Sequence, residues 1–95
     1  MDITASSNVV TIKGNIKSVN DYQTIKSTID SIVQTQDSIV IDIKDSISIT
    51  SSIIGYFTKL VQKEGIDLSI KVGNASLFEL LEELNLVGLF KVRKA

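Results

Sequence analysis

Three residue types that carry much of protein chemistry are missing from this sequence: its 95 residues include no cysteine, no histidine and no proline. Without cysteine and histidine, the chain has no disulfides, thiol nucleophiles, histidine general bases or zinc sites built on these ligands. A lack of cysteine is also compatible with a reducing compartment. There is no proline-rich or low-complexity stretch and no break in composition, so no linker is predicted. We therefore predict one domain, residues 1–95, with no metal and no other cofactor.

Charge of one sign and long apolar runs are also scarce. Ten basic and eleven acidic residues leave a net charge of −1. The one basic cluster, Lys91, Arg93 and Lys94, is too short to form a nucleic-acid surface. No apolar run reaches the length of a membrane span, and residues 1–4 lack the charged and hydrophobic parts of a signal segment. The prediction is a cytoplasmic protein that neither binds nucleic acid nor inserts into a membrane.

The spacing of the apolar residues that are present predicts a hairpin followed by a helix. Ile3 and residues 9–12 predict two short strands, joined by a polar turn at residues 6–8. Ser18 and Asp21 then have the spacing of a helix capping box. Apolar residues recur at steps of three and four along the segment that follows, which predicts an amphipathic helix.

Further along the chain, strands and helices alternate. Residues 39–43 are a run of β-branched side chains interrupted by an aspartate, a pattern typical of a strand buried on both faces. A second helical stripe runs from Ile53 to Val61 and ends at Gly65, a residue suited to a left-handed helix end. Apolar residues alternate again in the strand predicted at residues 68–72.

The last elements complete the pattern. Ser76 and Glu79 predict a capping box for a third helix, and a short last strand is expected at residues 91–93. The order is ββαβαβαβ, in which each helix can cross between parallel strands. We predict an α/β fold with a mostly parallel central sheet, an N-terminal hairpin-like strand pair and helices covering both faces of the sheet.

The hydroxyl residues Thr50, Ser51 and Ser52 stand at the predicted start of the second helix. Backbone N–H groups are unpaired at a helix N-terminus, and the helix dipole favours negative charge there. Hydroxyl side chains in this place most often only cap the helix. They can also bind an anion or accept a phosphate, so the chemical interest of this chain centres on these three residues.

Four segments of the chain, in this order and covering nearly its whole length, resemble the STAS domain family. The family includes bacterial anti-sigma-factor antagonists and the C-terminal domains of sulfate transporters. Residues 10–16 resemble the family's second strand with its glycine, and residues 41–43 resemble its Leu-Asp-Leu-Ser strand. Residues 50–55, Thr-Ser-Ser-Ile-Ile-Gly, fall without a gap on its Asp-Ser-Ser-Gly-Leu-Gly segment, and residues 84–90 resemble its ending with a Gly-Leu pair.

The resemblance implies a regulatory binding module that is not an enzyme. The first serine of the matching segment is the family's phosphoacceptor, which places it at Ser51, with Ser52 and Thr50 as alternates. The unphosphorylated protein would bind a partner that is both anti-sigma factor and serine kinase, and phosphorylation would abolish that binding. The docking surface would comprise these positions, the segment after the second strand and an exposed side chain of the second helix: Asn15, Lys17, Thr50, Ser51, Ser52 and Tyr56.

Three positions depart from the family pattern and leave a second interpretation open. Thr50 stands in place of the usual aspartate, Ile53 in place of glycine, and Lys17 where many antagonists carry an acidic residue. The changes at Thr50 and Lys17 make the site more positive. That charge would retune recognition by the kinase or stabilise a phosphoserine through pairing with Lys17, or it would accompany a loss of this regulation. The alternative function is a phosphorylation-independent STAS scaffold subunit of a lipid-transport or stress-signalling complex.

Other chemistry is less favoured by the sequence. Asp42 and Asp45 could suggest a carboxylate pair or a magnesium site, but Asp42 interrupts a strand and Asp45 falls in a loop. A hydrolase that used Ser51 as nucleophile would need a base to activate the hydroxyl, and no motif supplies one. A nucleotide site would need a phosphate-binding signature that the chain lacks.

Overall fold

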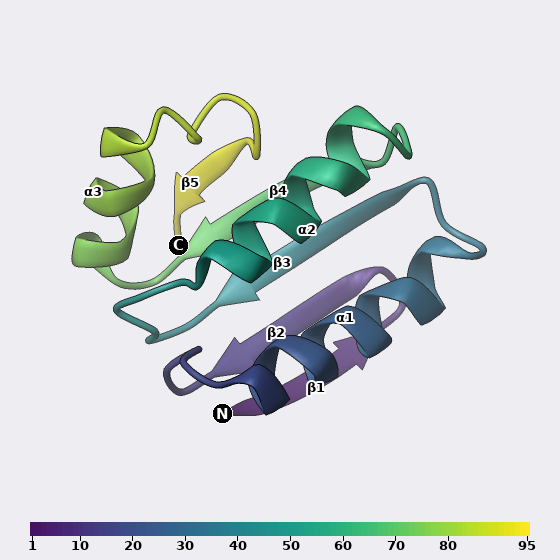
Figure 1. The fold of residues 1–95 in the computed structure, drawn as a ribbon, viewed down its shortest axis with the longest axis horizontal. Helices are drawn as coiled ribbons and strands as arrows, with labels where there is room; N and C mark the ends of the chain where they lie inside the picture. Colours follow the sequence, from purple (N-terminus) through teal and green to yellow (C-terminus); the bar gives the residue numbers. More distant parts are fainter.

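The computed structural model describes all 95 residues and contains five strands and three helices in the predicted order (Figure 1). The strands are β1 (Asp2–Ser6), β2 (Val9–Lys13), β3 (Ser38–Ile43), β4 (Asp67–Val72) and β5 (Val92–Lys94). The helices are α1 (Val19–Val33), α2 (Ser51–Gln62) and α3 (Ala75–Glu83). The α/β class and the N-terminal hairpin are therefore confirmed.

The sheet is mixed, and its strands lie in sequence order from β1 to β5. β1 pairs with β2 in antiparallel fashion, whereas β2, β3, β4 and β5 pair in parallel. Because the strand order never reverses, right-handed crossovers bring every helix to the same face of the sheet. Figure 1 shows α1 and α2 side by side in front of the strands.

This arrangement corrects the prediction that helices cover both faces of the sheet. In β3 the side chains of Ile39, Ile41 and Ile43 are buried, whereas the alternating Val40 and Asp42 remain partly exposed. β4 shows the same alternation. The domain therefore has two layers, with a helix-covered face and an open face. The β-branched run of β3 reflects strand preference as well as burial.

The core lies between the helices and the covered face of the sheet. One row of it crosses the sheet in register through Val10, Ile41, Ile70 and Val92, all buried. The helices and the segment before β5 complete it; the buried apolar residues are Val10, Ile12, Ile16, Ile25, Ile29, Ile39, Ile41, Ile43, Ile53, Tyr56, Phe57, Leu60, Leu68, Ile70, Val72, Leu77, Leu81, Phe90 and Val92.

The start of α1 and the end of α2 agree with the sequence. The Ser18 hydroxyl accepts a hydrogen bond from the Asp21 N–H at 3.0 Å, and the Asp21 carboxylate accepts one from the Ser18 N–H at 3.2 Å. This is the predicted capping box. After α2, Gly65 adopts a left-handed conformation with φ of 66°, and the next N–H donates to the Leu60 carbonyl.

Two predicted boundaries toward the C-terminus are wrong. The cap of α3 is Asn74, whose side-chain oxygen accepts hydrogen bonds from the backbone N–H groups of Ser76 and Leu77 at 2.8 and 3.2 Å. Asparagine is as good an N-cap as serine and comes first in the chain, so Ser76 and Glu79 form no capping box. β5 begins one residue later than predicted because Lys91 takes a left-handed conformation with φ of 49°.

Candidate functional site

The predicted hydroxyl site lies where two loops leave neighbouring parallel strands. β2 and β3 are parallel and pair at Ile12 and Ile43, so both strands finish at the same end of the sheet, that of their carboxyl termini. The loop of residues 14–18 leads from β2 to α1, and the loop of residues 44–50 leads from β3 to α2. The N-termini of α1 and α2 therefore lie near this end of the sheet (Figure 1). The unpaired backbone N–H groups of a helix lie at its N-terminus, so those of both helices are found here.

Side chains join these two loops into one unit. The buried Ser46 hydroxyl accepts a hydrogen bond from the Ile16 N–H at 3.1 Å and donates to the Ser48 carbonyl at 2.7 Å. Asp45 accepts from the Gly14 N–H at 2.6 Å, and the side-chain oxygen of Asn15 accepts from the backbone of the opposite loop at 3.0 Å. Each loop thus supplies acceptors to the backbone of the other.

Two of these residues change the sequence interpretation. Asn15 was predicted to bind a partner; its side chain is exposed, but its oxygen already accepts the Ile47 N–H. Ser46 was not predicted at all and is the only fully buried polar residue of the chain. The alternation of serine and isoleucine in residues 46–49 was the available signal, but such residues look like ordinary loop residues until a second loop packs against them.

The structure separates the roles of Thr50, Ser51 and Ser52. Thr50 is the N-cap of α2, with an extended backbone, and its hydroxyl accepts a hydrogen bond from the Ile53 N–H at 3.3 Å. Ser51 and Ser52 are the first two residues of the helix, are exposed, and make no side-chain hydrogen bond. The capping role therefore belongs to Thr50, and the two serine hydroxyls are free for another role.

A hollow of about 310 Å³ lies between the starts of α1 and α2. It is lined by Lys17, Ser18, Val19, Tyr22, Gln23, Thr50 and Ser52. The structure thus brings together Lys17, Thr50 and Ser52, three of the six positions of the predicted docking surface. Ser51, Asn15 and Tyr56 lie outside this hollow, so Ser52 is the serine that shares it with Lys17.

The surroundings of the hollow favour negative charge. α2 has no acidic residue in its first turn, and Lys17 forms no ion pair. The nearest carboxylate by sequence, Asp21, does not line the hollow. The backbone N–H groups of Lys17 and Ser18 hold the pKa of Asp21 below its usual range, so it stays ionised at the start of α1. Lys17 and two helix N-termini therefore border the hollow without a free acidic group among its lining residues.

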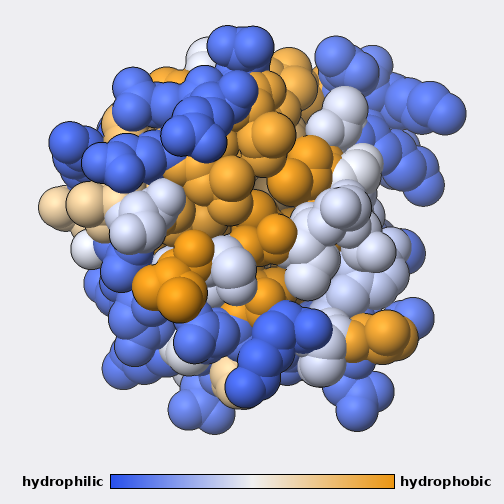
Figure 2. All heavy atoms as spheres, turned by 60° about the vertical axis from the view of Figure 1, so that its left-hand side comes forward, coloured by the Kyte–Doolittle hydropathy of each residue, from blue (hydrophilic) through white to orange (hydrophobic).

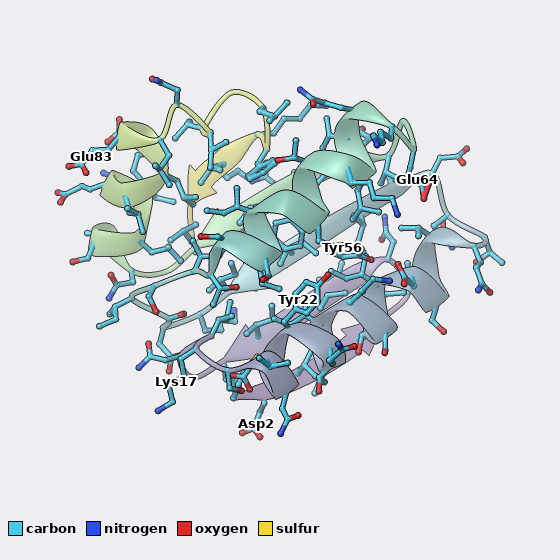
Figure 3. All side chains as sticks on the ribbon, viewed as in Figure 1. Asp2, Lys17, Tyr22, Tyr56, Glu64 and Glu83 are labelled. Carbon is cyan, nitrogen blue, oxygen red and sulfur yellow. The ribbon has the colours of Figure 1, made fainter.

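Tyr56 does not have the exposed position predicted for it. Only 6% of its surface is exposed, and its hydroxyl donates a hydrogen bond to Asp30 of α1 at 2.5 Å. Its ring packs edge-to-face against Tyr22 (Figure 3), with the Lys26 ammonium 5.5 Å from the ring centre. Burial, together with the bond to Asp30, raises the pKa of Tyr56 far above that of free tyrosine. Because it lies on the flank of α2 that faces α1, Tyr56 holds two helices together and is not available to anchor a partner.

The acidic residues do not gather into a metal site. Asp42 pairs with Lys44 at 2.8 Å on the open face of the sheet, whereas Asp45 bonds to Gly14 in the loop. Asp42 therefore forms an ion pair at the end of its strand and Asp45 stabilises the loops, so the two do not act as a carboxylate pair. No group of three or more cysteine, histidine, aspartate or glutamate side chains is placed to hold an ion.

Comparison with known proteins assigns no family. No protein-family model matches the chain, and neither a curated protein nor a solved structure matches it. None of the three helices has the length and apolar character needed to cross a membrane. The STAS resemblance thus stays a prediction from the sequence motifs, and function must be argued from the site.

Proposed function

We propose that this protein is a non-enzymatic binding module of the STAS type, with Ser51 as its phosphorylation switch. In its unphosphorylated form it binds an anti-sigma factor that is also a serine kinase, and phosphorylation of Ser51 releases that partner. The proposed setting is the cytoplasm, where ATP and such a kinase occur together. Ser52 is the alternate phosphoacceptor, whereas Thr50 is the weakest of the three because its hydroxyl caps α2.

The observation that carries the proposal is the state of the Ser51 hydroxyl. It is exposed, unbonded and at the first position of a twelve-residue helix whose capping is done by its neighbour. A kinase can reach such a hydroxyl without unfolding the domain. The new phosphate would lie beside unpaired backbone N–H groups, which favour it, so modification leaves the fold intact.

Phosphorylation of Ser51 would add negative charge to the surface beside the hollow. The unmodified region has Lys17 and two helix N-termini and no free carboxylate at the hollow. A phosphoserine adds a charge of about −1.5 to −2. A partner that fits the unmodified surface would then meet repulsion and an added desolvation cost, which explains release without any change of shape.

Exposed apolar side chains beside the site offer apolar surface that a bound partner would cover. Val19, at the start of α1, is 75% exposed and lines the hollow, and Ile47 in the loop before α2 is 58% exposed. Figure 2 views the side of the molecule at the left of Figure 1 and shows apolar residues at the surface with polar residues around them. These two side chains, rather than Tyr56, are the proposed apolar anchors of the docking surface.

The test uses the protein as bait in lysates of its source organism. We expect Ser51→Ala to retain a partner with a kinase-type ATPase domain and Ser51→Asp to lose it. Incubation of the wild type with that partner and ATP should then add one phosphate, located at Ser51 by mass spectrometry. Phosphate found only outside residues 50–52, or equal capture by both folded variants, would remove Ser51 as the switch.

Ser27 offers a matched control. It is an exposed serine on α1, outside the hollow. Ser27→Asp adds the same charge to the molecule as Ser51→Asp, so it should leave capture of the partner unchanged. Loss of capture by both variants would point to overall charge and not to the site. Ser52→Asp, tested alongside, reports whether the second serine shares the role.

One observation favours the scaffold alternative. Ile53 stands where the family has glycine, and its side chain is fully buried in the core. The first turn of α2 is therefore fixed by packing, which suits a subunit whose binding surface does not change. If the module serves a lipid-transport or stress-signalling complex as a phosphorylation-independent subunit, both Ser51 variants should capture the same partner. That partner would be a transporter-type ATPase or a further STAS subunit and not a kinase.

A further inference from the structure

The two edges of the sheet differ in how well they are protected against pairing with another strand. An edge strand exposes unpaired N–H and C=O groups, and proteins commonly protect such edges with short strands, lysine, proline or bulges. β5, at one edge, has only three residues, two of them the exposed Arg93 and Lys94. β1, at the other edge, has five residues, no basic side chain and regular pairing with β2 along its whole length.

The outer side of β1 has no partner within the chain. Outside the β1–β2 ladder, residues 2–6 take part in no backbone hydrogen bond, and their side chains make none. Four of the five residues are exposed, and Ile3 is half-buried. Figure 1 shows β1 at the lower border of the sheet, beyond β2. This edge is therefore open for one more strand.

We propose that β1 pairs in antiparallel fashion with β1 of a second copy of this chain, which joins two five-stranded sheets into one. The sequence of β1 is complementary to itself when a two-fold axis passes through its central residue, Thr4. Ile3 then faces Ala5 of the second copy, Asp2 faces Ser6, and Thr4 faces its own counterpart. No like charges oppose each other, and threonine pairs are favourable across strands.

The two faces of the joined sheet also match across this axis. Ile3 and Ala5 pair within the chain with the buried Ile12 and Val10, so they lie on the helix-covered face. Pairing would therefore bury the half-exposed Ile3 against an apolar neighbour. On the open face, Thr4 is paired with Thr11, and the axis would extend this pair into a row of four threonines.

Helix α1 packs over β1, and the flank that it would turn toward the second copy carries small side chains whose polar groups are already hydrogen-bonded. Its charged Lys26 and Asp30 lie on the flank that faces α2, whereas Thr24 and Thr28 lie on the opposite flank. The hydroxyls of Thr24 and Thr28 donate to backbone carbonyls of their own helix at 2.9 and 2.8 Å. These side chains can thus be buried between two α1 helices without leaving a polar group unpaired.

The proposal is independent of the Ser51 switch. In the sheet, β2 separates β1 from β3, and α2 follows β3, so the edge and the start of α2 belong to different parts of the domain. A dimer of this kind can carry its two Ser51 sites in either state. Failure of the phosphorylation experiments would therefore leave the dimer intact, and the reverse also holds.

The experiment places opposite charges at the centre of the interface. In a dimer, Thr4→Lys brings two lysines directly opposite each other, and Thr4→Glu brings two glutamates together. For each variant alone, the dissociation constant of the dimer should rise by roughly tenfold or more, because like charges placed opposite each other at an interface repel. An equimolar mixture of the two variants should associate as tightly as the wild type or more tightly.

Thr11→Lys is the matched control, since Thr11 is the same residue type on the same face, one strand further from the edge. In the dimer its counterpart would lie three strand spacings away, about 14 Å, beyond the range of strong charge interaction in physiological salt. Sedimentation over a concentration series measures the wild type, the three variants and the equimolar mixture, five samples in all, and circular dichroism checks that each is folded. A wild type that stays monomeric at every concentration, or a dimer that Thr4→Lys leaves unchanged, overturns the proposal.

Discussion

At the scale of single residues, the Ser46 side chain links the two loops that form the candidate site. It bonds to the backbone of residue 16 in one loop and to that of residue 48 in its own, and it is fully buried. A buried polar group has a stabilising effect only while its partners are present. Ser46 therefore helps to fix the loop that leads into α2.

We predict that Ser46→Ala destabilises the domain. The substitution leaves the buried Ile16 N–H without its acceptor, which costs about 1–3 kcal/mol. Urea unfolding at neutral pH measures the change. Ser27→Ala on the exposed surface of α1 is the control, with an expected change of no more than about 0.5 kcal/mol. Equal midpoints for the two variants would show that Ser46 does not join the loops.

At the scale of elements, the start of α2 places a capping hydroxyl, that of Thr50, next to an exposed hydroxyl without a hydrogen bond, that of Ser51. Thr50 satisfies a backbone N–H of the helix, while Ser51 satisfies none. We predict that Thr50→Ala lowers the free energy of unfolding by about 1 kcal/mol and that Ser51→Ala changes it by less than about 0.5 kcal/mol. Ser51→Asp should be stabilising by about 0.3–1 kcal/mol through the helix dipole. Thermal or urea unfolding of the three variants gives the order, and a larger loss for Ser51→Ala than for Thr50→Ala would contradict it.

The contact between α1 and α2 depends on the charge of Asp30. Burial works against this charge, but hydrogen bonds from Lys26 and Tyr56 outweigh it and hold the pKa of Asp30 below its ordinary value. A carboxyl group with a lowered folded-state pKa stabilises the fold above the unfolded pKa of about 3.9, and this contribution is lost as the pH falls through the folded value. The packing of Tyr56 against α1 should therefore weaken in acid.

This gives a pH-dependent prediction. Asp30→Asn should destabilise the domain at about pH 7, and the gap between variant and wild type should narrow below about pH 4, where the wild type loses the same charge. Urea midpoints over a pH series measure the gap. Asp37→Asn is the control, because the Asp37 side chain is exposed and makes no hydrogen bond or ion pair, so that variant should follow the wild type. A gap for Asp30→Asn that stays constant with pH would contradict the assignment.

At the scale of the whole molecule, the sheet has one covered and one open face. Val40 and Ile41 are neighbours in β3 that point to opposite faces, and only Ile41 is fully buried. Ile41→Ala should lower the free energy of unfolding by about 2–5 kcal/mol. Val40→Ala should lower it by about 1 kcal/mol, the range of strand preference. Chemical unfolding compares the two, and similar large losses would indicate a covered second face, for example in a complex.

Much of the fold and part of the site followed from local patterns in the sequence. The order of the elements, the Ser18 capping box and the left-handed Gly65 were predictable because each depends on residues within a few positions of one another. The cap of α3 was mispredicted because Asn74 and Ser76 compete for the same role within three residues. The hydroxyl positions of the site were predictable, but the division of roles among them was not.

By itself the sequence determined the α/β class, the hairpin and the placement of three hydroxyl residues at the start of a helix, because periodicity and helix-end chemistry are local. Only the tertiary structure decided that all helices lie on one face, since this depends on the order of strands in the sheet. It also decided that Tyr56 is buried against α1 and that Ser46 joins two loops. Burial and long-range hydrogen bonds depend on which elements pack against each other. The spacing of residue types along the chain predicts the elements but not how they pack.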